Sequence, residues 1–135
     1  MLAPGPNPST GLGALIGIDW QEVGPDKARA RIAVTPAVCQ PFGIVHGGSI
    51  AALAESVCSA ATWDTVRHDE MIAMGQSNNA SYLRPVSSGH VNCEATSRHR
   101  GTTTWVWDCD LTDDDGRLCA IVRMTIAVRP MPAQP

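Results

Sequence analysis

One run of apolar and small residues constrains the fold of this chain more than any other feature. Between Gly48 and Trp63 the sequence is SIAALAESVCSAAT. Its alanine-rich composition, its length and the lack of glycine or proline after Gly48 predict a helix over 49–63. Because this helix is apolar on nearly all sides, we expect it to be buried rather than to lie on the surface.

Side chains that alternate with a period of two predict five strands around this helix. The predicted strands are 27–35, 71–83, 90–99, 103–111 and 117–128. Turns are predicted at 87–89, at 100–101 and at 113–116, where Asp-Gly marks a hairpin tip. Short connections favour antiparallel neighbours, so we predict an α+β domain with the helix in the concave face of an antiparallel meander.

The bulk composition bounds the class of protein. The 135 residues fit one domain, predicted at 11–130 between flexible ends at 1–10 and 131–135. A net charge of −3 argues against a nucleic-acid partner but allows a small anionic ligand. Neither a bilayer-spanning run of about 18 apolar residues nor a signal peptide is recognisable, so no membrane partner is expected.

The five cysteines argue for a reducing environment. Their number is odd and no two have C-x-x-C spacing. We therefore expect neither a disulfide framework nor a zinc ribbon, and we expect a cytoplasmic protein.

Glu55 is the single acidic or basic residue within the apolar run. A carboxylate in apolar surroundings costs several kcal/mol unless it is paired, hydrogen-bonded or protonated. A helix of alanine and leucine gains no stability from it, which makes Glu55 a candidate catalytic group. The structural alternative is that Glu55 pairs with an arginine and fixes the packing of the helix.

The pair Gly47 and Gly48 precedes the helix. First-turn N–H groups lack intrahelical partners and carry partial positive charge, and glycine allows a ligand to approach the backbone closely. These properties suit an oxyanion site for a carbonyl oxygen that gains charge. The alternative is a plain turn in which Ser49 caps the helix.

Helical spacing relates the two features. Gly47, Ala51, Glu55 and Ser59 share one face, and Ser59 is placed to hold the Glu55 carboxylate or a water molecule. Gly47 and Glu55 are nevertheless about 12 Å apart along the axis. One substrate carbonyl cannot contact both on the same helix, so we predict an active site at a subunit interface.

Other polar and aromatic residues give weaker indications. His46 is a candidate general base, or it holds the loop through a backbone hydrogen bond. The remaining histidines have no metal-ligand spacing. Trp105 and Trp107 share one strand face and are expected in the core.

Several segments together resemble a known family. They are 40–56 (QPFGIVHGGSIAALAES), 75–86 (GQSNNASYLRPV), 89–91 (GHV), 103–108 (TTWVWD), 114–120 (DDGRLCA) and 126–130 (IAVRP). Over about 17–130 the chain is similar to the hotdog-fold acyl-CoA thioesterases, in particular to the 4-hydroxybenzoyl-CoA thioesterase of the Arthrobacter type. The resemblance implies an antiparallel sheet wrapped around one long central helix.

The resemblance also implies roles for individual residues. Glu55 matches the catalytic carboxylate, as nucleophile or as base on water, and the Gly47 N–H matches the group that polarises the thioester carbonyl. Gln40 falls beside the thioester, and Ser59 falls where the family has threonine. The implied contacts to coenzyme A (CoA) are Arg84, Thr102, Thr103 and His90. A homo-oligomer, as a dimer of dimers, and no cofactor other than the CoA of the substrate are implied as well.

Two departures from the family affect what binds. The compared family member ends in a basic stretch that helps to bind the CoA phosphate, whereas 131–135 is uncharged here. Either CoA binds more weakly, or Arg98, Arg100 or Arg129 meets the phosphate instead. The expected acyl-pocket residues Ala60, Trp63 and Asn79 also differ in part.

The expected activity is hydrolysis of an aromatic acyl-CoA to the free acid and CoA. A thioesterase for 1,4-dihydroxy-2-naphthoyl-CoA or another bicyclic aryl-CoA is the nearest alternative. A dehydratase of the same fold, a non-catalytic acyl-CoA-binding module and a purely structural oligomerisation domain are the others.

Overall fold

The computed structural model describes residues 10–133, and most of the predicted flexible end at 1–10 lies outside this range, as do residues 134–135. The elements in chain order are α1 (Gly11–Ile16), β1 (Asp19–Val23), β2 (Lys27–Ala33), the 3₁₀ turn η1 (Pro36–Val38), α2 (Gly47–Val66), the 3₁₀ turn η2 (Arg67–Asp69), β3 (Met71–Tyr82), β4 (His90–Arg100), β5 (Thr104–Thr112) and β6 (Leu118–Pro130).

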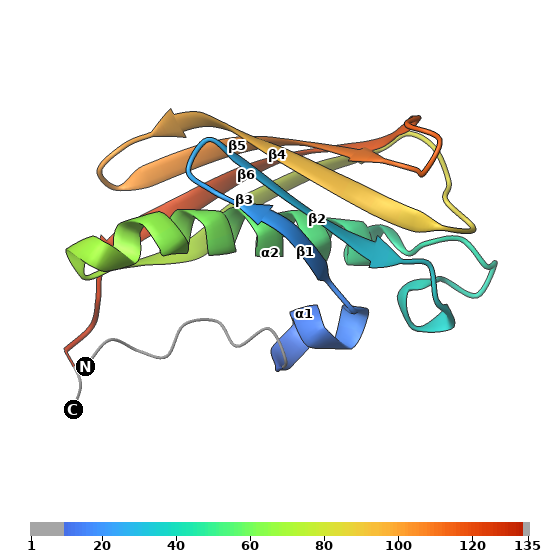
Figure 1. Cartoon of the computed structure of the whole chain (residues 1–135), viewed down its shortest axis with the longest axis horizontal. Helices are drawn as coiled ribbons and strands as arrows, with labels where there is room; N and C mark the ends of the chain where they lie inside the picture. Colours follow the sequence, from blue (N-terminus) through green and yellow to red (C-terminus); the bar gives the residue numbers. More distant parts are fainter. Residues whose placement is uncertain (1–9, 134–135) are drawn as a thin grey trace.

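The six strands form one antiparallel sheet that curves around α2 (Figure 1). The strand order is β1-β2-β4-β5-β6-β3. Alternate side chains of the strands point toward α2, among them Ala30, Cys93, Trp107 and Met124, and all are buried. The predicted α+β architecture, with one helix in the concave face of the sheet, is confirmed.

The predicted meander is wrong at one connection. β3 pairs with β6, while β4 lies between β2 and β5. β3 and β4 are therefore three strand positions apart, about 14 Å at the usual spacing. The seven-residue connection at 83–89 is long enough to cover that distance. The elements α1 and β1 were not predicted, because short segments without a clear period give little signal.

The helix α2 is buried on one side only. Its eight buried residues are Ile50, Leu53, Ala54, Val57, Cys58, Ala61, Thr62 and Val66. On the other side Ala51 and Ser59 are half-buried and Glu55 is exposed, so the prediction of a helix buried all round is wrong for the single chain. No helix within residues 10–133 is long and apolar enough to cross a membrane.

A buried hydrogen-bond chain joins α2 to the sheet. The Thr62 hydroxyl donates to the carbonyl of Cys58 at 2.8 Å and accepts from the indole N–H of Trp107 at 2.9 Å. Trp107 is fully buried and Trp105 nearly so, which confirms that both tryptophans belong to the core. The Thr62 hydroxyl and the Trp107 indole N–H thus both have hydrogen-bond partners, as buried polar groups require.

All five cysteines are free thiols, as predicted. Cys58 of α2 and Cys109 of β5 bring their sulfur atoms to 3.3 Å in the core. Burial raises the pKa of the Cys58 thiol well above its ordinary value, so this thiol is neutral and packs as a small apolar group.

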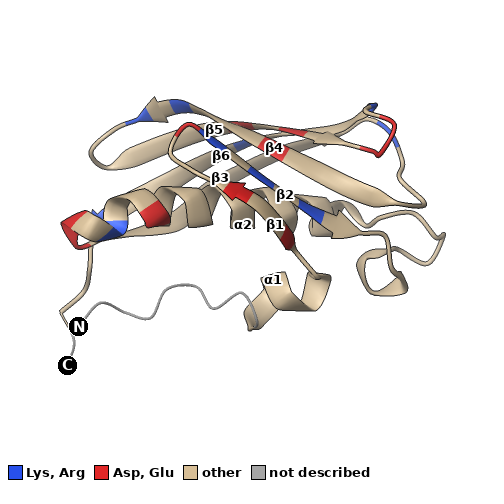
Figure 2. Cartoon of the chain, viewed as in Figure 1, with Lys and Arg blue, Asp and Glu red and all other residues tan. Residues whose placement is uncertain are grey.

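The two edges of the sheet differ in their protection. The edge strand β1 is five residues long, carries Asp19 and Glu22, and has a register shift between Trp20 and Glu22. Charges and bulges of this kind keep edge strands from pairing. The edge strand β3 is twelve residues long, mostly exposed, and contains no charged residue and no proline (Figure 2). β3 is thus the edge that is open to a further strand.

We expect Thr62→Val to lower the free energy of unfolding by about 1–3 kcal/mol, because the buried Trp107 N–H loses its acceptor. Urea unfolding checks this value. Thr65→Val is the matched control, since the Thr65 hydroxyl is half-buried and its single bond, to the carbonyl of Ala61, is 3.3 Å long. Equal destabilisation by the two variants would mean that the Trp107 contact contributes nothing specific.

Candidate active site

The Glu55 side chain lies on the open side of α2, against β3. Its Oε1 accepts a hydrogen bond from the Asn78 amide at 3.3 Å, and the same amide donates to the carbonyl of Ala51 at 3.0 Å. Within the described residues Glu55 forms no ion pair, so the alternative in which it pairs with an arginine is wrong. The carboxylate is exposed in the single chain and is held by one neutral amide.

Gly75 makes room for this carboxylate. A Cβ atom at Gly75 would lie 2.8 Å from Glu55 Oε2 and 2.9 Å from Cδ. The register of β3 shifts between Gly75 and Ser77. A glycine at a bulge is the usual device where another group must approach a strand closely. The strand is therefore shaped around the carboxylate.

The start of α2 leaves one backbone donor unoccupied. His46 is the N-cap, and its Nδ1 accepts from the Gly48 N–H at 2.8 Å. The N–H groups of Ser49 and Ile50 donate to the carbonyl of His46. Within residues 10–133 the Gly47 N–H has no recorded acceptor. The N-cap of α2 is therefore His46 and not Ser49. The hydrogen bond from the Gly48 N–H to His46 agrees with the expectation that His46 holds the loop.

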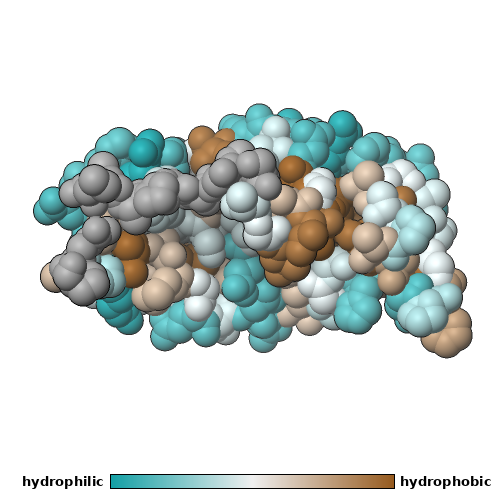
Figure 3. Space-filling view, turned by 90° about the horizontal axis from the view of Figure 1, so that it is seen from below, coloured by the Kyte–Doolittle hydropathy of each residue, from teal (hydrophilic) through white to brown (hydrophobic). Residues whose placement is uncertain are grey.

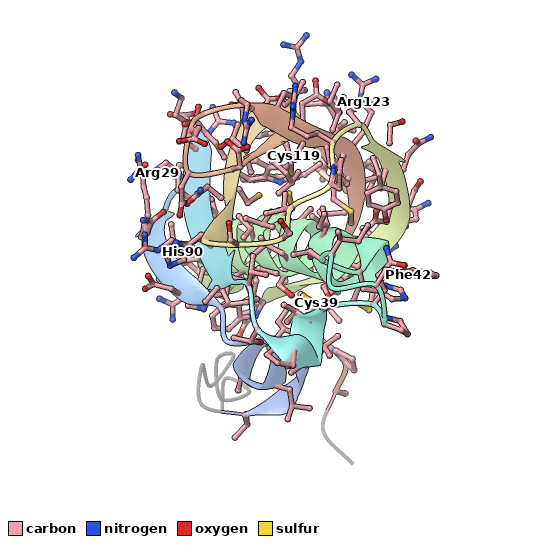
Figure 4. All side chains as sticks on the ribbon, turned by 90° about the vertical axis from the view of Figure 1, so that its right-hand side faces the viewer. Arg29, Cys39, Phe42, His90, Cys119 and Arg123 are labelled. Carbon is pink, nitrogen blue, oxygen red and sulfur yellow. The ribbon has the colours of Figure 1, made fainter. Side chains whose placement is uncertain are left out.

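A pocket of about 420 Å³ opens beside Gly47. Its walls include Gln40, Tyr82 and Arg84, so two predicted site residues lie together with Gly47. A Cβ atom at Gly47 would lie 2.8 Å from the Tyr82 ring. The loop before α2 carries Phe42 outward at this end of the molecule (Figure 4).

A second pocket, of about 330 Å³, lies further along the open side of α2. Its walls from α2 are Ser56, Ser59, Ala60 and Trp63, and the opposite walls come from α1, β1 and β3. Ser59 and the expected acyl-pocket residues Ala60 and Trp63 are thus together, one turn beyond Glu55. Asn79 does not line this pocket, because its neighbour Asn78 faces α2 and successive strand residues point to opposite sides.

α1 closes this second pocket from below. It contributes Gly13 and Ala14 to the lining, while Leu12 and Leu15 point outward and are exposed. Apolar residues gather on the face seen from this side (Figure 3).

The predicted CoA contacts are not together in one chain. Arg84 N donates to the carbonyl of Cys119, and Val128 N donates to the carbonyl of Thr103. These two attachment points are nine residues apart on β6, or roughly 30 Å at about 3.3 Å per residue. Arg84 and the pair Thr102 and Thr103 cannot hold the same nucleotide within one chain.

His90 is engaged elsewhere. Its Nδ1 lies 3.0 Å from Asp114 Oδ2, and Asn92 donates to the other oxygen of that carboxylate. Hydrogen bonds from Asn92 and His90 lower the pKa of Asp114. Figure 4 shows His90 and Phe42 on opposite flanks of α2. His90 lines neither of the two pockets along α2.

Two residues of this site had no predicted role: Gly75 and Asn78. A lone glycine within a strand pattern is a signal for a bulge or a close approach, and it was present at Gly75. Asn78 gave no such signal, because its contact with Glu55 depends on the pairing of β3 with β6 and on the seating of α2.

The architecture and the placement of this carboxylate define a class. A single long helix enclosed by an antiparallel sheet, with an acidic side chain on the open side of that helix, is the arrangement of the hotdog fold. A family model described as the thioesterase superfamily matches residues 42–120. The chain belongs to this superfamily.

Individual relatives agree with this assignment. The crystal structure of a mutant of the thioesterase PA1618 from Pseudomonas aeruginosa superposes with a TM-score of 0.88 at 36% identity, covering 92% of this chain and 89% of that one. The 1,4-dihydroxy-2-naphthoyl-CoA hydrolase of Listeria monocytogenes is 38% identical over 119 residues, which are 88% of this chain and 96% of that protein. The proofreading thioesterase EntH of Cronobacter turicensis is 36% identical over 123 residues, 89% of each chain. The predicted hotdog fold is confirmed.

We expect Gly75→Ala to lower kcat for thioester hydrolysis by about 10- to 100-fold, because displacing a reacting group by about 1 Å has effects of this size. The melting temperature should change little, since residue 75 is exposed. Ser77→Ala, on the other side of the bulge, is the matched control and should retain wild-type kcat. A Gly75→Ala enzyme as active as wild type would show that the Glu55 position does not depend on this contact.

Proposed function

We propose that this protein hydrolyses an aromatic acyl-CoA to the free acid and CoA, with Glu55 as the reacting carboxylate. The observation that carries the proposal is the Glu55 side chain, exposed on the open side of α2 and one turn from a pocket with two tryptophans, Trp20 and Trp63. In the proposed dimer the partner subunit would cover this carboxylate, and a thioester carbonyl held between the subunits would lie within its reach.

Two routes use the same geometry. In the first, a Glu55 oxygen attacks the thioester carbon, the C–S bond breaks, and water then hydrolyses the resulting anhydride. In the second, Glu55 takes a proton from a water molecule that attacks the same carbon. In both, the CoA thiolate departs without a strong acid, and no metal or redox cofactor is required.

Gly47 is the proposed oxyanion donor. Its N–H is the first-turn donor without an acceptor within residues 10–133, and it opens on the same pocket as Gln40. A donor of this kind is worth about 3 kcal/mol in the transition state. Gln40 would orient the thioester from the opposite wall, and Ser59 would orient Glu55 or the attacking water.

The distance between Glu55 and Gly47 requires a second chain. Both lie on α2, about 12 Å apart along the helix axis. The open, uncharged edge of β3 supports a dimer in which the β3 strands of two subunits pair antiparallel. The proposed register sets Gly75 opposite the partner subunit's Tyr82. Because Glu55 packs against Gly75 and Gly47 packs against Tyr82, this register brings the partner subunit's Gly47 toward Glu55.

The same pairing accounts for the CoA contacts. It brings the Arg84 end of one subunit beside the Thr102 and Thr103 turn of the other. The proposed contact residues, which are roughly 30 Å apart in one chain, then border one nucleotide site. The site is complete only in the dimer, and a dimer of dimers is the proposed assembly.

An aryl group is proposed for the acyl part because Trp20 and Trp63 offer flat apolar walls in a pocket of about 330 Å³. A 4-hydroxybenzoyl-like group is the first candidate. The bicyclic 1,4-dihydroxy-2-naphthoyl group is the second, supported by the 38% identity to the Listeria monocytogenes hydrolase of that ester. We further propose a cytoplasmic location, because the cysteines are free thiols.

A rival from another class is an acyl-CoA-binding module that leaves the ester intact. It would bind CoA esters without releasing thiol, and it gives no reason for an exposed Glu55 shaped into β3 by Gly75. A purely structural oligomerisation domain would show no thermal stabilisation by CoA at all.

We expect Glu55→Gln to lower kcat by about 10³-fold or more while the melting temperature stays near that of wild type, because the amide can neither attack nor accept a proton. Thiol release from 4-hydroxybenzoyl-CoA, 1,4-dihydroxy-2-naphthoyl-CoA and an aliphatic acyl-CoA measures both the activity and the acyl preference. Glu94→Gln, an exposed acid on β4, is the control. Most of kcat remaining in Glu55→Gln, or no thiol release by wild type from any of these esters, would refute the proposal.

We expect removal of the Gly47 N–H to lower kcat by about 10²-fold or more, the effect of losing one oxyanion donor. Gly47→Pro is tolerated at the first helical position because His46 is already extended, at φ −66° and ψ 131°. The test variant also carries Tyr82→Ala, which makes room for the Cβ atom of residue 47. The matched control is the double variant Gly47→Ala/Tyr82→Ala, which keeps the N–H. Equal kcat values for Gly47→Pro/Tyr82→Ala and this control would exclude Gly47 as a donor.

Mixing these chains tests the shared site. Glu55→Gln subunits and Gly47→Pro/Tyr82→Ala subunits are each inactive alone, but a mixed dimer has one site with both groups intact. Random exchange should restore about a quarter of wild-type activity, because half of the dimers are mixed and each has one working site. A fully active monomer in sedimentation, or no recovery after verified exchange, would contradict the intersubunit site.

A further inference from the structure

Within the described residues one side chain holds the Glu55 carboxylate, the amide of Asn78 on β3. The amide nitrogen donates to Glu55 Oε1 at 3.3 Å and to the carbonyl of Ala51 at 3.0 Å. A helix carbonyl has two lone pairs, so Ala51 can accept this bond in addition to its intrahelical one. Ser59, which was expected to hold the carboxylate, has no recorded hydrogen bond to it in this part of the chain. Asn78 therefore ties the acid to the backbone of α2.

The two acceptors determine which way the Asn78 amide points. A carboxylate oxygen and a peptide carbonyl oxygen only accept hydrogen bonds, so the NH₂ group must face both of them. The opposite orientation would place Oδ1 against two other oxygen atoms. Oδ1 has no recorded donor within residues 10–133, and the Asn78 side chain is exposed. A free amide acceptor thus lies beside the carboxylate.

An amide oxygen and a carboxylate side by side can bind one water molecule through both of its protons. Nδ2 and Oδ1 of Asn78 are bonded to the same carbon atom, and Nδ2 contacts Glu55. Oδ1 is therefore within one bridging water of the carboxylate. A water molecule that donates to both groups turns a lone pair outward, which is the orientation needed for attack on a carbonyl carbon.

The contacts of the carboxylate favour proton transfer over direct attack. Oε1 is bound to Asn78, and Oε2 lies so close to Gly75 that a Cβ atom there would be 2.8 Å away. To form an anhydride, a carboxylate oxygen would have to advance by roughly 2 Å from the near-attack distance of about 3–3.5 Å to bonding distance. That movement pulls the carboxylate away from Asn78 and Gly75. As a base, the carboxylate stays in place and only a proton moves.

We propose that Asn78 is a positioning residue for hydrolysis: its N–H groups hold Glu55, its Oδ1 orients the attacking water, and Glu55 acts as general base. The proposal rests on the proposed function and chooses between its two routes. The water oxygen forms a bond to the thioester carbon while one water proton passes to Glu55. The C–S bond then breaks, and the thiolate takes the proton from Glu55, which gives the free acid and CoA.

The first test compares Asn78→Leu with Asn92→Leu in the full-length protein. Asn92 is the matched control because its amide has the same two kinds of acceptor, the carbonyl of Thr112 at 3.3 Å and a carboxylate oxygen of Asp114 at 3.0 Å. Asn92 lines neither pocket along α2. We expect Asn78→Leu to lower kcat for 4-hydroxybenzoyl-CoA by about 10- to 100-fold at unchanged KM, because misplacing a reacting group has effects of this size.

Asn92→Leu should keep the wild-type kcat and KM. Equal losses of kcat in the two variants would trace the effect to the loss of two hydrogen bonds and would overturn the role of Asn78. Wild-type kcat in Asn78→Leu would overturn it as well.

The second test follows a single turnover of 4-hydroxybenzoyl-CoA by excess wild-type enzyme, so it does not depend on how a variant folds. With Glu55 as base, thiol and free acid appear with the same rate constant, and thiol release is slower in D₂O because a proton moves in that step. Thiol that appears ahead of the acid, or at the same rate in H₂O and D₂O, would assign the anhydride route and overturn the proposal. A wild type that releases no thiol from any aryl-CoA refutes the proposed function instead.

Discussion

The one-sided burial of α2 governs the rest of the structure. The sheet encloses the face that carries Leu53, Val57 and Ala61, and the indole of Trp107 is tied to Thr62 of the same face. That contact fixes the rotation of α2 about its axis. Once the rotation is fixed, Glu55 must project from the opposite side, toward β3 and away from the core. Apolar burial on one face thus places the acid on the other.

β3 connects the helix to the proposed assembly. On its inner side Gly75 and Asn78 receive the Glu55 carboxylate, and its outer edge has no strand partner within the described residues. A long edge strand without charge or proline is a hazard for a solitary chain. Pairing of this edge with a second copy would cover it and would also bring a second α2 N-terminus toward Glu55. One surface therefore serves both stability and chemistry in the proposed dimer.

Electrostatics shape the remaining part of the proposed site. The outer face of the sheet carries cross-strand ion pairs such as Arg31 with Asp19 and Arg123 with Asp108 (Figure 2). Exposed pairs of this kind contribute little stability each, but they neutralise the arginines that form them. Arg84 and Arg129 form no such pair within the described residues, and they lie near opposite ends of β6. A nucleotide site shared by two chains would use this arrangement.

Several features followed directly from local patterns in the sequence. The apolar run with its single acid predicted α2 and Glu55, and the alternation along 117–128 predicted β6, because helix and strand periods depend on near neighbours in the chain. The pair Gly47 and Gly48 correctly marked the helix start. The arithmetic of helical rise separated Gly47 from Glu55 without any coordinates.

Tertiary structure alone decided the rest. The pairing of β3 with β6, the exposure of Glu55, the role of Asn78 and the anchoring of Arg129 on Thr103 all join residues that are far apart in the sequence. Local periodicity specifies which residues share a face, but not which face meets which partner. That choice depends on how the whole sheet closes around one side of α2, and it is therefore made only when the chain folds.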